Sequence, residues 1–404
     1  MNYRYLAKEA YCSVFHAGMK IGNYALPYRI PELLEGPGCI RQLPAKIREK
    51  KCRNILLVTD RQLLKLGLLD SLKEELEKEG IEYTVFADIQ PNPTDENVEE
   101  GYRLFYIHDC DGIIAFGGGS PMDCAKGIAA KNAHPNKSIA EMQGILKVHK
   151  KIVPFWAVPT TAGTGSETTL AAVITEAKTH HKASINDPCI MPAYAVLDPE
   201  LTVGLPAHIT ASTGMDALCH AVESYTNYTY CTDLEKDYSK RAVKLIYENL
   251  LKAYNDGTDL EARQNMQKAA FYAGRSFTRG CVGYVHAVGH TLSGLYGVPH
   301  GLAMAVILPH VMKQFGPAVY ERLGELADVI GLEGDTPQEK SGAFITWIEE
   351  MNERMNIPKG FDMIRDEDVP QIIAWADKEA NPLYPVPVIW KEEDFRKLIA
   401  SIRL

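Results

Sequence analysis

The chain has 404 residues, of which 46% are hydrophobic and 24% charged, so it is ordinary globular material with enough length for two or three domains. Its formal net charge is −9 and no basic run stands out, which argues against a nucleic-acid partner. The nine cysteines stand singly, without a Cys-x-x-Cys pair. This usage is typical of a reducing compartment rather than of a disulfide framework or a zinc ribbon.

Signals for secretion or membrane insertion are missing from the pattern. The first ten residues carry charges where a signal peptide needs an apolar core. No apolar run reaches the length that spans a bilayer. We therefore expect a soluble cytoplasmic protein without a membrane partner.

The first half of the chain alternates strand and helix patterns. Residues 1 to about 30 are rich in aromatic side chains and poor in clear periodicity, and we interpret them as an extension packed on the body of the protein or on a partner subunit. Short apolar runs predict strands at 55–60, 83–86, 112–116 and 152–158, and helical spacing appears at 61–79 and about 95–107. Such alternation implies parallel pairing with right-handed crossovers, and hence an α/β sheet.

From about residue 205 the pattern becomes helical, after a break near Asp198 and Pro206. Helices are predicted at 210–228, 233–254, 260–278, 281–296, 302–314 and 316–331, with few β-branched runs between them. The sequence therefore predicts an N-terminal α/β dinucleotide-binding domain over residues 1–204, which includes the extension of residues 1–30. A C-terminal α-helical metal-binding domain is predicted over residues 205–404.

Metal-ligand residue types cluster in the predicted helical half. Asp216 and His220 are four residues apart, as are His286 and His290, so each pair lies on one face of a helix, and His300 follows in a segment that suggests a loop. Taken alone, an Asp-x-x-x-His pair is more often a surface hydrogen bond. Here, however, the histidines stand among Gly, Ala, Val and Leu, where unpaired imidazoles would cost a few kcal/mol. A shared Zn²⁺ or Fe²⁺ ion would satisfy them together.

Two glycine-rich stretches each follow a predicted strand. Gly117 to Asp123 (Gly-Gly-Gly-Ser-Pro-Met-Asp) stands at a strand-to-helix junction, where free backbone N–H groups favour an anion. Pro159 to Glu167 (Pro-Thr-Thr-Ala-Gly-Thr-Gly-Ser-Glu) offers hydroxyl groups and glycines that suit a pyrophosphate. The alternatives are a tight turn and a polar loop, and neither stretch is a Gly-x-Gly-x-x-Gly motif. Together they favour a dinucleotide.

Further candidates for binding the cofactor lie near these stretches. Asp60 ends the first predicted strand, where its carboxylate would accept hydrogen bonds from the adenosine ribose and repel a 2′-phosphate, which selects NAD over NADP. The alternative is that Asp60 caps the next helix. Asn92, in turn material after the second strand, and Asp123 complete this group.

With these motifs in place, the chain resembles the iron-containing (group III) alcohol dehydrogenases over about residues 30 to 400. The resemblance rests on Gly117-Gly-Gly-Ser-Pro-Met-Asp-Cys-Ala-Lys126, Pro159-Thr-Thr-Ala-Gly-Thr-Gly-Ser-Glu167, Thr213-Gly-Met-Asp-Ala-Leu-Cys-His220 and His286-x₃-His290-x₉-His300-Gly301. It implies a Rossmann-like parallel-sheet domain followed by a helical domain, in a dehydroquinate synthase-like fold with the active site between them. A homodimer is also implied.

The resemblance assigns roles to individual residues. Asp216, His220, His286 and His300 are implied as metal ligands, and His290 as an unligated histidine at the substrate site. The residues implied to contact the cofactor are Gly118, Gly119, Ser120, Thr160, Thr161 and Lys182, and Phe277 is implied to line the substrate pocket. Glycerol dehydrogenases resemble three-ligand zinc enzymes and maleylacetate reductases are metal-free, so the complete quartet favours Fe²⁺. Zinc or another divalent ion could use the same ligands.

The expected activity is reversible hydride transfer between a small primary alcohol, or its aldehyde, and NAD, with the metal as Lewis acid. A dehydroquinate-synthase-like lyase is one alternative, but it would need several Lys and Arg residues for its substrate, and the neighbours of the ligand motifs are mostly apolar. A glycerol- or diol-type dehydrogenase of the same superfamily is another. A non-catalytic nucleotide sensor is a third, and a complete metal quartet argues against it.

Overall fold

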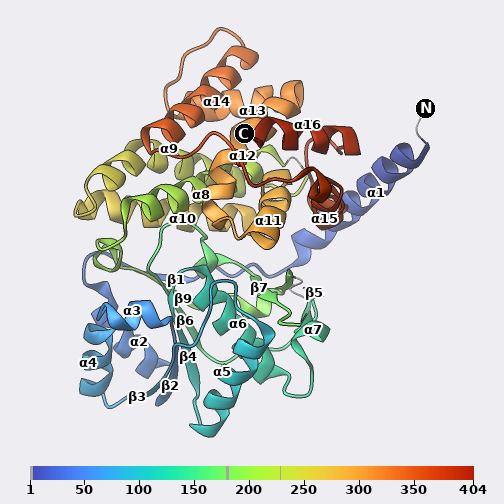
Figure 1. Cartoon of the computed structure of the whole chain (residues 1–404). Coiled ribbons are helices and arrows are strands. Elements are labelled where there is room, and N and C mark those ends of the chain that lie inside the picture. Colours follow the sequence, from blue (N-terminus) through green and yellow to red (C-terminus); the bar gives the residue numbers. More distant parts are fainter. Residues whose placement is uncertain (1–2, 179–181, 228) are drawn as a thin grey trace. The chain divides into compact units, whose positions relative to one another are not determined.

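The computed structural model describes residues 3–178, 182–227 and 229–404 (Figure 1). It divides into two compact units. The first comprises Pro27–Leu205 with Gly257–Phe271, and the second comprises Met1–Leu26, Pro206–Asp256 and Tyr272–Leu404. This division differs from the predicted domains in two segments. Residues 1–26 of the predicted extension belong to the helical unit, and residues 257–271 belong to the α/β unit.

A six-stranded parallel sheet forms the centre of the α/β unit. Its strands lie in the order β1 (Glu32–Glu35), β9 (Tyr194–Leu197), β6 (Phe155–Pro159), β4 (Gly112–Gly117), β2 (Asn54–Val58) and β3 (Glu82–Phe86). The four strands predicted from apolar runs are confirmed. The short strands β1 and β9 were not predicted, nor was a smaller sheet of β5 (Gly144–Ile145), β8 (Lys182–Asn186) and β7 (Ala171–Thr175).

Both faces of the large sheet are buried, which explains why its strands are continuous apolar runs. Leu56 and Ile113 belong to one hydrophobic cluster, whereas their chain neighbours Leu57 and Ile114 belong to the other. The covering helices are α2 (Leu43–Glu49), α3 (Arg61–Lys65), α4 (Asp70–Lys78), α5 (Asp95–Ile107), α6 (Gly119–Ala133) and α7 (Ile139–Met142). The single helix predicted over 61–79 is broken at Gly67, which has a φ of +70°.

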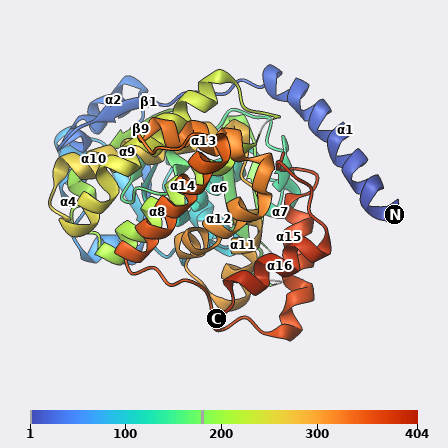
Figure 2. The same cartoon turned by 90° about the horizontal axis from the view of Figure 1, so that it is seen from above.

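The helical unit is built around α12 (His300–Phe315), which packs against α8 (Ala207–Thr226), α11 (Tyr284–Tyr296), α14 (Pro337–Arg354) and α16 (Glu392–Ile402) (Figure 2). It also contains α9 (Asp233–Asn255), α13 (Tyr320–Val329), α15 (Val369–Ala380) and the second part of α10 (Leu260–Gly280). The six helices predicted from the pattern are confirmed. Helices α14 to α16 were not predicted. Among the described helices, none combines the length and apolar character needed to cross a membrane.

The N-terminal extension is a long helix, α1 (Tyr3–Ala25). One side of it is buried against the helical unit, with Cys12, His16 and Asn23 among its least exposed side chains. The opposite side leaves Val14 and Ile21 about three-quarters exposed, at 75% and 76%. The extension therefore packs on the body of its own chain, which is one of the two arrangements predicted from the sequence.

Candidate functional site

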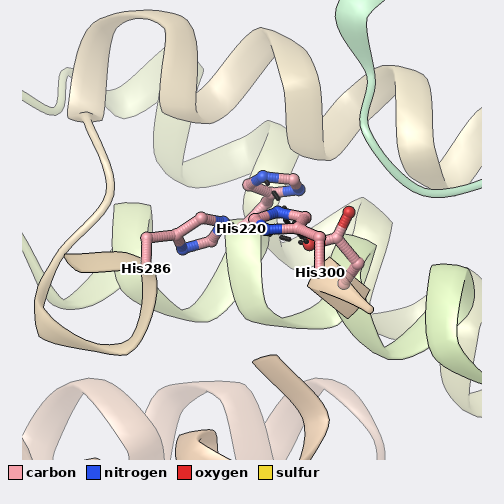
Figure 3. A group of neighbouring side chains, drawn as sticks. His220, His286 and His300 are labelled. Atoms are coloured by element: carbon pink, nitrogen blue, oxygen red, sulfur yellow. Dashed lines mark ion pairs between the residues drawn. The ribbon is translucent and has the colours of Figure 1, made fainter. Parts of the chain in front are cut away.

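Three helices of the second unit bring four metal-ligand side chains together. Asp216 and His220 come from α8, His286 from α11 and His300 from the first turn of α12. The Oδ1 atom of Asp216 lies 4.0 Å from Nε2 of His220, 3.9 Å from Nε2 of His286 and 3.3 Å from Nε2 of His300. Figure 3 shows the three imidazole rings gathered around one point. Donor atoms of all four residues lie within 4.8 Å of one another.

The quartet has the properties of a cation site. Donors about 2.1 Å from one tetrahedral ion are separated by about 3.4 Å, which is close to the observed distances. Among the described residues, Oδ1 of Asp216 and Nε2 of His286 are buried and have no hydrogen-bond partner. Unpartnered buried donors and acceptors cost about 1–3 kcal/mol each. A shared divalent ion would satisfy both atoms, so the residues fit the metal that the sequence motifs imply.

Burial sets the charge of these side chains. It lowers the pKa of His220 to about 3 and, together with the neighbouring His300, lowers the pKa of His286 well below its ordinary range. Both imidazoles are therefore neutral at pH 7, which is the form that binds a metal. Burial alone would raise the pKa of Asp216, but His220, His300 and His286 hold this pKa well below its usual range. The site thus offers one carboxylate and neutral imidazoles.

Close helix contacts place His300 within reach of Asp216. A Cβ atom on Gly301 would lie 2.4 Å from the backbone oxygen of Ser212 in α8, a separation that no side chain can occupy. A Cβ atom on Gly289 would meet only Cε of Met304, at 2.0 Å, and this flexible side-chain end can shift. Gly301 is therefore the glycine that lets α12 approach the backbone of α8.

Glu223, which was not predicted as a site residue, stands behind His286. Its Oε2 lies 2.5 Å from Nδ1 of His286, and its Oε1 accepts a hydrogen bond of 2.8 Å from the backbone N–H of Val285. Burial raises the pKa of Glu223 to about 7, against hydrogen bonds from the backbone of Gly283 and Val285 that lower it. With a hydrogen on Nδ1, Nε2 of His286 keeps its lone pair for a metal. The spacing Asp216-x₃-His220-x₂-Glu223 on one helix face was the signal available in the sequence.

His290 lies beside the quartet but outside it. Its ring centroid is 5.1 Å from that of His300, and its Nδ1 is 2.7 Å from Oε1 of Glu379 in α15. The phenyl ring of Phe277 stacks on His220 with centroids 4.2 Å apart. The structure therefore places both predicted substrate-site residues around the four metal-ligand side chains.

In the α/β unit, the two predicted glycine-rich stretches lie next to each other because they follow neighbouring strands, β4 and β6. The backbone N–H of Thr160 donates to the carbonyl of Gly117 at 3.1 Å. A Cβ atom on Gly118 would be 3.4 Å from Thr161, and one on Gly119 would be 3.0 Å from Thr164. Gly118 caps the N-terminus of α6, so its N–H groups form an edge suited to an anion.

Most of the remaining cofactor candidates join this edge. The backbone N–H of Asn92 donates to Oγ of Ser120 at 3.2 Å, and Nζ of Lys182 donates to Oδ1 of Asn92 at 2.8 Å. Oδ1 of Asp123 accepts a hydrogen bond of 3.2 Å from Ser166. Oδ1 of Asp60 accepts from the backbone of Gln62 and Leu63, both at 2.9 Å, so Asp60 caps α3 as the alternative interpretation expected.

A buried lysine anchors the second stretch, and sequence reasoning had not given it a role. Nζ of Lys126 lies 2.7 Å from the carbonyl oxygen of Ser166, 3.0 Å from that of Thr169 and 2.9 Å from that of Ala171. The side chain is fully buried, and burial lowers its pKa to about 8. Lys126 thus ties α6 to the chain that follows β6.

Comparison with known proteins identifies the family. The iron-containing alcohol dehydrogenase family matches residues 31–199, and the C-terminal family of Fe-containing alcohol dehydrogenases matches residues 210–402. Alcohol dehydrogenase 4 of Schizosaccharomyces pombe is 38% identical over 87% of this chain and 84% of its own. NAD-dependent methanol dehydrogenase of Bacillus methanolicus is 36% identical over 86% of this chain and 91% of its own.

Structural comparison gives the same result. A crystal structure of 1,3-propanediol oxidoreductase matches with a TM-score of 0.89 at 34% identity, covering 93% of this chain and 99% of that protein. Sequence motifs, fold and relatives thus agree. The chain belongs to the iron-containing alcohol dehydrogenase family and is an oxidoreductase of that family.

Proposed function

We propose that the protein catalyses reversible hydride transfer between a small primary alcohol and NAD, with Fe²⁺ as its resident metal. The quartet of Asp216, His220, His286 and His300 is the observation that carries this proposal, because its donor atoms lie within 4.8 Å of one another. Among the described residues, two of these atoms, Oδ1 of Asp216 and Nε2 of His286, are buried without a hydrogen-bond partner. A divalent cation held by these four side chains would lower the pKa of the alcohol hydroxyl and, in the reverse direction, would polarise the aldehyde carbonyl. Zn²⁺ or another divalent ion can use the same donors.

His290 is proposed as the catalytic histidine. It is close enough to His300, with ring centroids 5.1 Å apart, to meet a substrate held at the quartet, yet it does not belong to the donor group. Its imidazole would accept the hydroxyl proton of the alcohol during oxidation and, in the reverse direction, would donate a proton to the oxygen of the aldehyde as its carbon accepts the hydride. Phe277, stacked on His220, would give the site an apolar wall suited to the alkyl part of the substrate.

The cofactor residues are proposed from the α/β unit. Gly118, Gly119 and Ser120 at the start of α6 would bind the pyrophosphate through backbone N–H groups, with the hydroxyls of Thr160 and Thr161 beside them. Asn92 and Lys182 would contact the ribose or nicotinamide, and Asp123 would hold Ser166 near the phosphates. Asp60 uses Oδ1 as a helix cap, and its negative charge would still disfavour the 2′-phosphate of NADP.

The test is aldehyde-dependent NADH oxidation by protein purified without air, after chelation and after adding back Fe²⁺ or Zn²⁺, with NADPH in parallel. We expect activity to disappear on chelation, to return with Fe²⁺ and to be strongest with NADH. A chelated protein that keeps full turnover would contradict the metal assignment. Activity with NADPH alone would contradict the role of Asp60 and leave the quartet standing.

We also propose that the protein works in the cytoplasm as a homodimer. The nine cysteines are all free thiols, as is usual in a reducing compartment. The dimer follows from the resemblance to the family, and analytical ultracentrifugation checks it. A monomer at micromolar concentration would contradict this part of the proposal.

A further inference from the structure

A hydrogen-bonded chain of side chains lies behind His290. Oε1 of Glu379 is 2.7 Å from Nδ1 of His290 and also accepts a hydrogen bond of 3.0 Å from the hydroxyl of Tyr384. A carboxylate only accepts hydrogen bonds, so the hydrogen of this contact sits on Nδ1 of the imidazole. A neutral histidine protonated at Nδ1 has its lone pair at Nε2. That lone pair is what a proton acceptor requires.

The hydroxyl of Tyr384, which donates to Glu379 from the other side, keeps its hydrogen. Burial, together with the charge of Glu379 and its hydrogen bond, raises the pKa of Tyr384 well above its ordinary value, so the phenol keeps its hydrogen. The carboxylate of Glu379 is therefore held from two sides. Charge-assisted hydrogen bonds of this kind are about twice as strong as neutral ones and fix the direction of both partners.

The segment that carries Glu379 and Tyr384 is braced by α1. Lys8 pairs with Asp377 and also lies 3.1 Å from the carbonyl oxygen of Trp390. The ring nitrogen Nε2 of His16 lies 2.7 Å from the carbonyl oxygen of Pro382. These contacts fall on both sides of Glu379 and Tyr384 along the chain. Helix α1 lies outside the family matches, which begin at residue 31, so the brace is additional to them.

We propose that Glu379 is a positioning residue that places the hydrogen of His290 on Nδ1 and leaves Nε2 as the proton acceptor. Tyr384 orients Glu379, and α1 fixes the segment 377–390 that carries them both. This inference rests on the proposed function, because it assumes that His290 accepts the proton of the alcohol. It assigns a role in the reaction to the N-terminal helix, through contacts with the chain around Glu379.

The first experiment compares Glu379→Gln and Tyr384→Phe with the wild-type protein, all full-length and loaded with Fe²⁺. Glu353→Gln is the matched control, since Glu353 is exposed on α14. We expect Glu379→Gln to lower kcat by about 100-fold, in the range of general acid–base effects. KM, iron content and melting temperature should stay near the wild-type values, and Tyr384→Phe should have a smaller effect. Glu379→Gln with wild-type kcat, or with loss of iron or of the fold, would overturn the proposal.

The second experiment reads the hydrogen position directly and needs no turnover. In zinc-loaded protein labelled with ¹⁵N-histidine, the His290 resonances, assigned by their loss in His290→Gln, should show hydrogen on Nδ1 and none on Nε2. Glu379→Gln should change this pattern, and Glu353→Gln should not. Hydrogen on Nε2 in the wild-type protein would overturn the inference. If the pattern is as expected but no alcohol or aldehyde is turned over, the proposed function fails and the positioning role does not.

The third experiment tests the brace. Lys8→Met combined with His16→Leu removes the contacts of α1 with Asp377, Trp390 and Pro382. Hydrogen–deuterium exchange in residues 377–390 should become faster, and kcat should fall by about 3- to 10-fold, less than in Glu379→Gln. Val14→Ala is the control, because Val14 is 75% exposed on the other side of the same helix. Unchanged exchange and unchanged kcat in the double variant would remove α1 from the proposal.

Discussion

The two candidate sites of this chain are built in different ways. The candidate metal site in the helical unit consists of side-chain atoms, and among the described residues some of these, such as Oδ1 of Asp216, are buried without a hydrogen-bond partner. The proposed nucleotide edge in the α/β unit, formed by the two glycine-rich stretches after β4 and β6, consists mainly of backbone groups. It is already held together by hydrogen bonds such as that from the backbone N–H of Thr160 to the carbonyl of Gly117. A single substitution should therefore abolish the first site, whereas the second should weaken by degrees.

Replacing a proposed metal ligand should have the largest effect. His286→Ala removes one donor and leaves Glu223 buried without its imidazole partner. We expect iron affinity to fall by more than about 100-fold, beyond the range seen for outer-shell residues. Turnover should fall with it, while NADH binding, followed by fluorescence, stays unchanged. His208→Ala is the control on α8, since His208 is exposed. If His286→Ala keeps its iron, His286 is not a ligand.

Replacing Glu223 should lower iron affinity less than replacing the proposed ligand His286. Glu223→Gln keeps the shape of the side chain and removes the charge that holds Nδ1 of His286. Iron affinity, measured by competition with a chelator, should fall by about 10- to 100-fold. NADH affinity should not change. An iron affinity equal to that of the wild-type protein would show that Glu223 only packs against α11.

Replacing Lys126, the buried lysine behind the nucleotide edge, should weaken NADH binding. Lys126→Met keeps a linear apolar side chain of similar length but removes the ammonium group that binds the carbonyls of Ser166, Thr169 and Ala171. The carbonyls of Ser166 and Ala171 keep hydrogen bonds from Thr169. One unpaired buried carbonyl costs about 1–3 kcal/mol, so the free energy of unfolding should fall by about that amount in urea titrations. NADH should bind more weakly and iron content should stay the same. Equal losses of NADH and iron binding would mean that Lys126 supports the whole fold.

Local spacing identified the candidate metal donors better than it separated their proposed roles. Asp216 with His220, and His286 with His290, share the same four-residue spacing on a helix. In the structure His286 points to Asp216, whereas His290 points to Glu379, which is 89 residues away in sequence. Spacing alone could not distinguish the two histidines, because the partner that decides between them comes from α15. Only the resemblance to the family implied different roles for them.

Helix α1 and strand β1 were not predicted because the local sequence pattern of each is weak. Helix α1 was not predicted because its buried side includes two polar residues, His16 and Asn23, so hydrophobic periodicity could not show it. Strand β1 has only four residues, Glu-Leu-Leu-Glu, and pairs with β9 about 160 residues later. Such long-range pairing decides strand formation where the local pattern is too short to do so. The central strands were predicted because burial on both faces makes them continuously apolar.

The smallest effect is expected at Asp60, where two roles can be separated. Asn is as good an N-cap as Asp, so Asp60→Asn should keep the cap of α3 and remove only the negative charge. We expect kcat/KM with NADPH to rise by about tenfold relative to NADH, which corresponds to about 1.4 kcal/mol, without a change in stability. Asp60→Ala should show the same shift in cofactor preference and lose about 1 kcal/mol of stability with its cap. If the cofactor preference stays fixed in both variants while stability falls only in Asp60→Ala, Asp60 is a helix cap and the nucleotide edge selects its cofactor elsewhere.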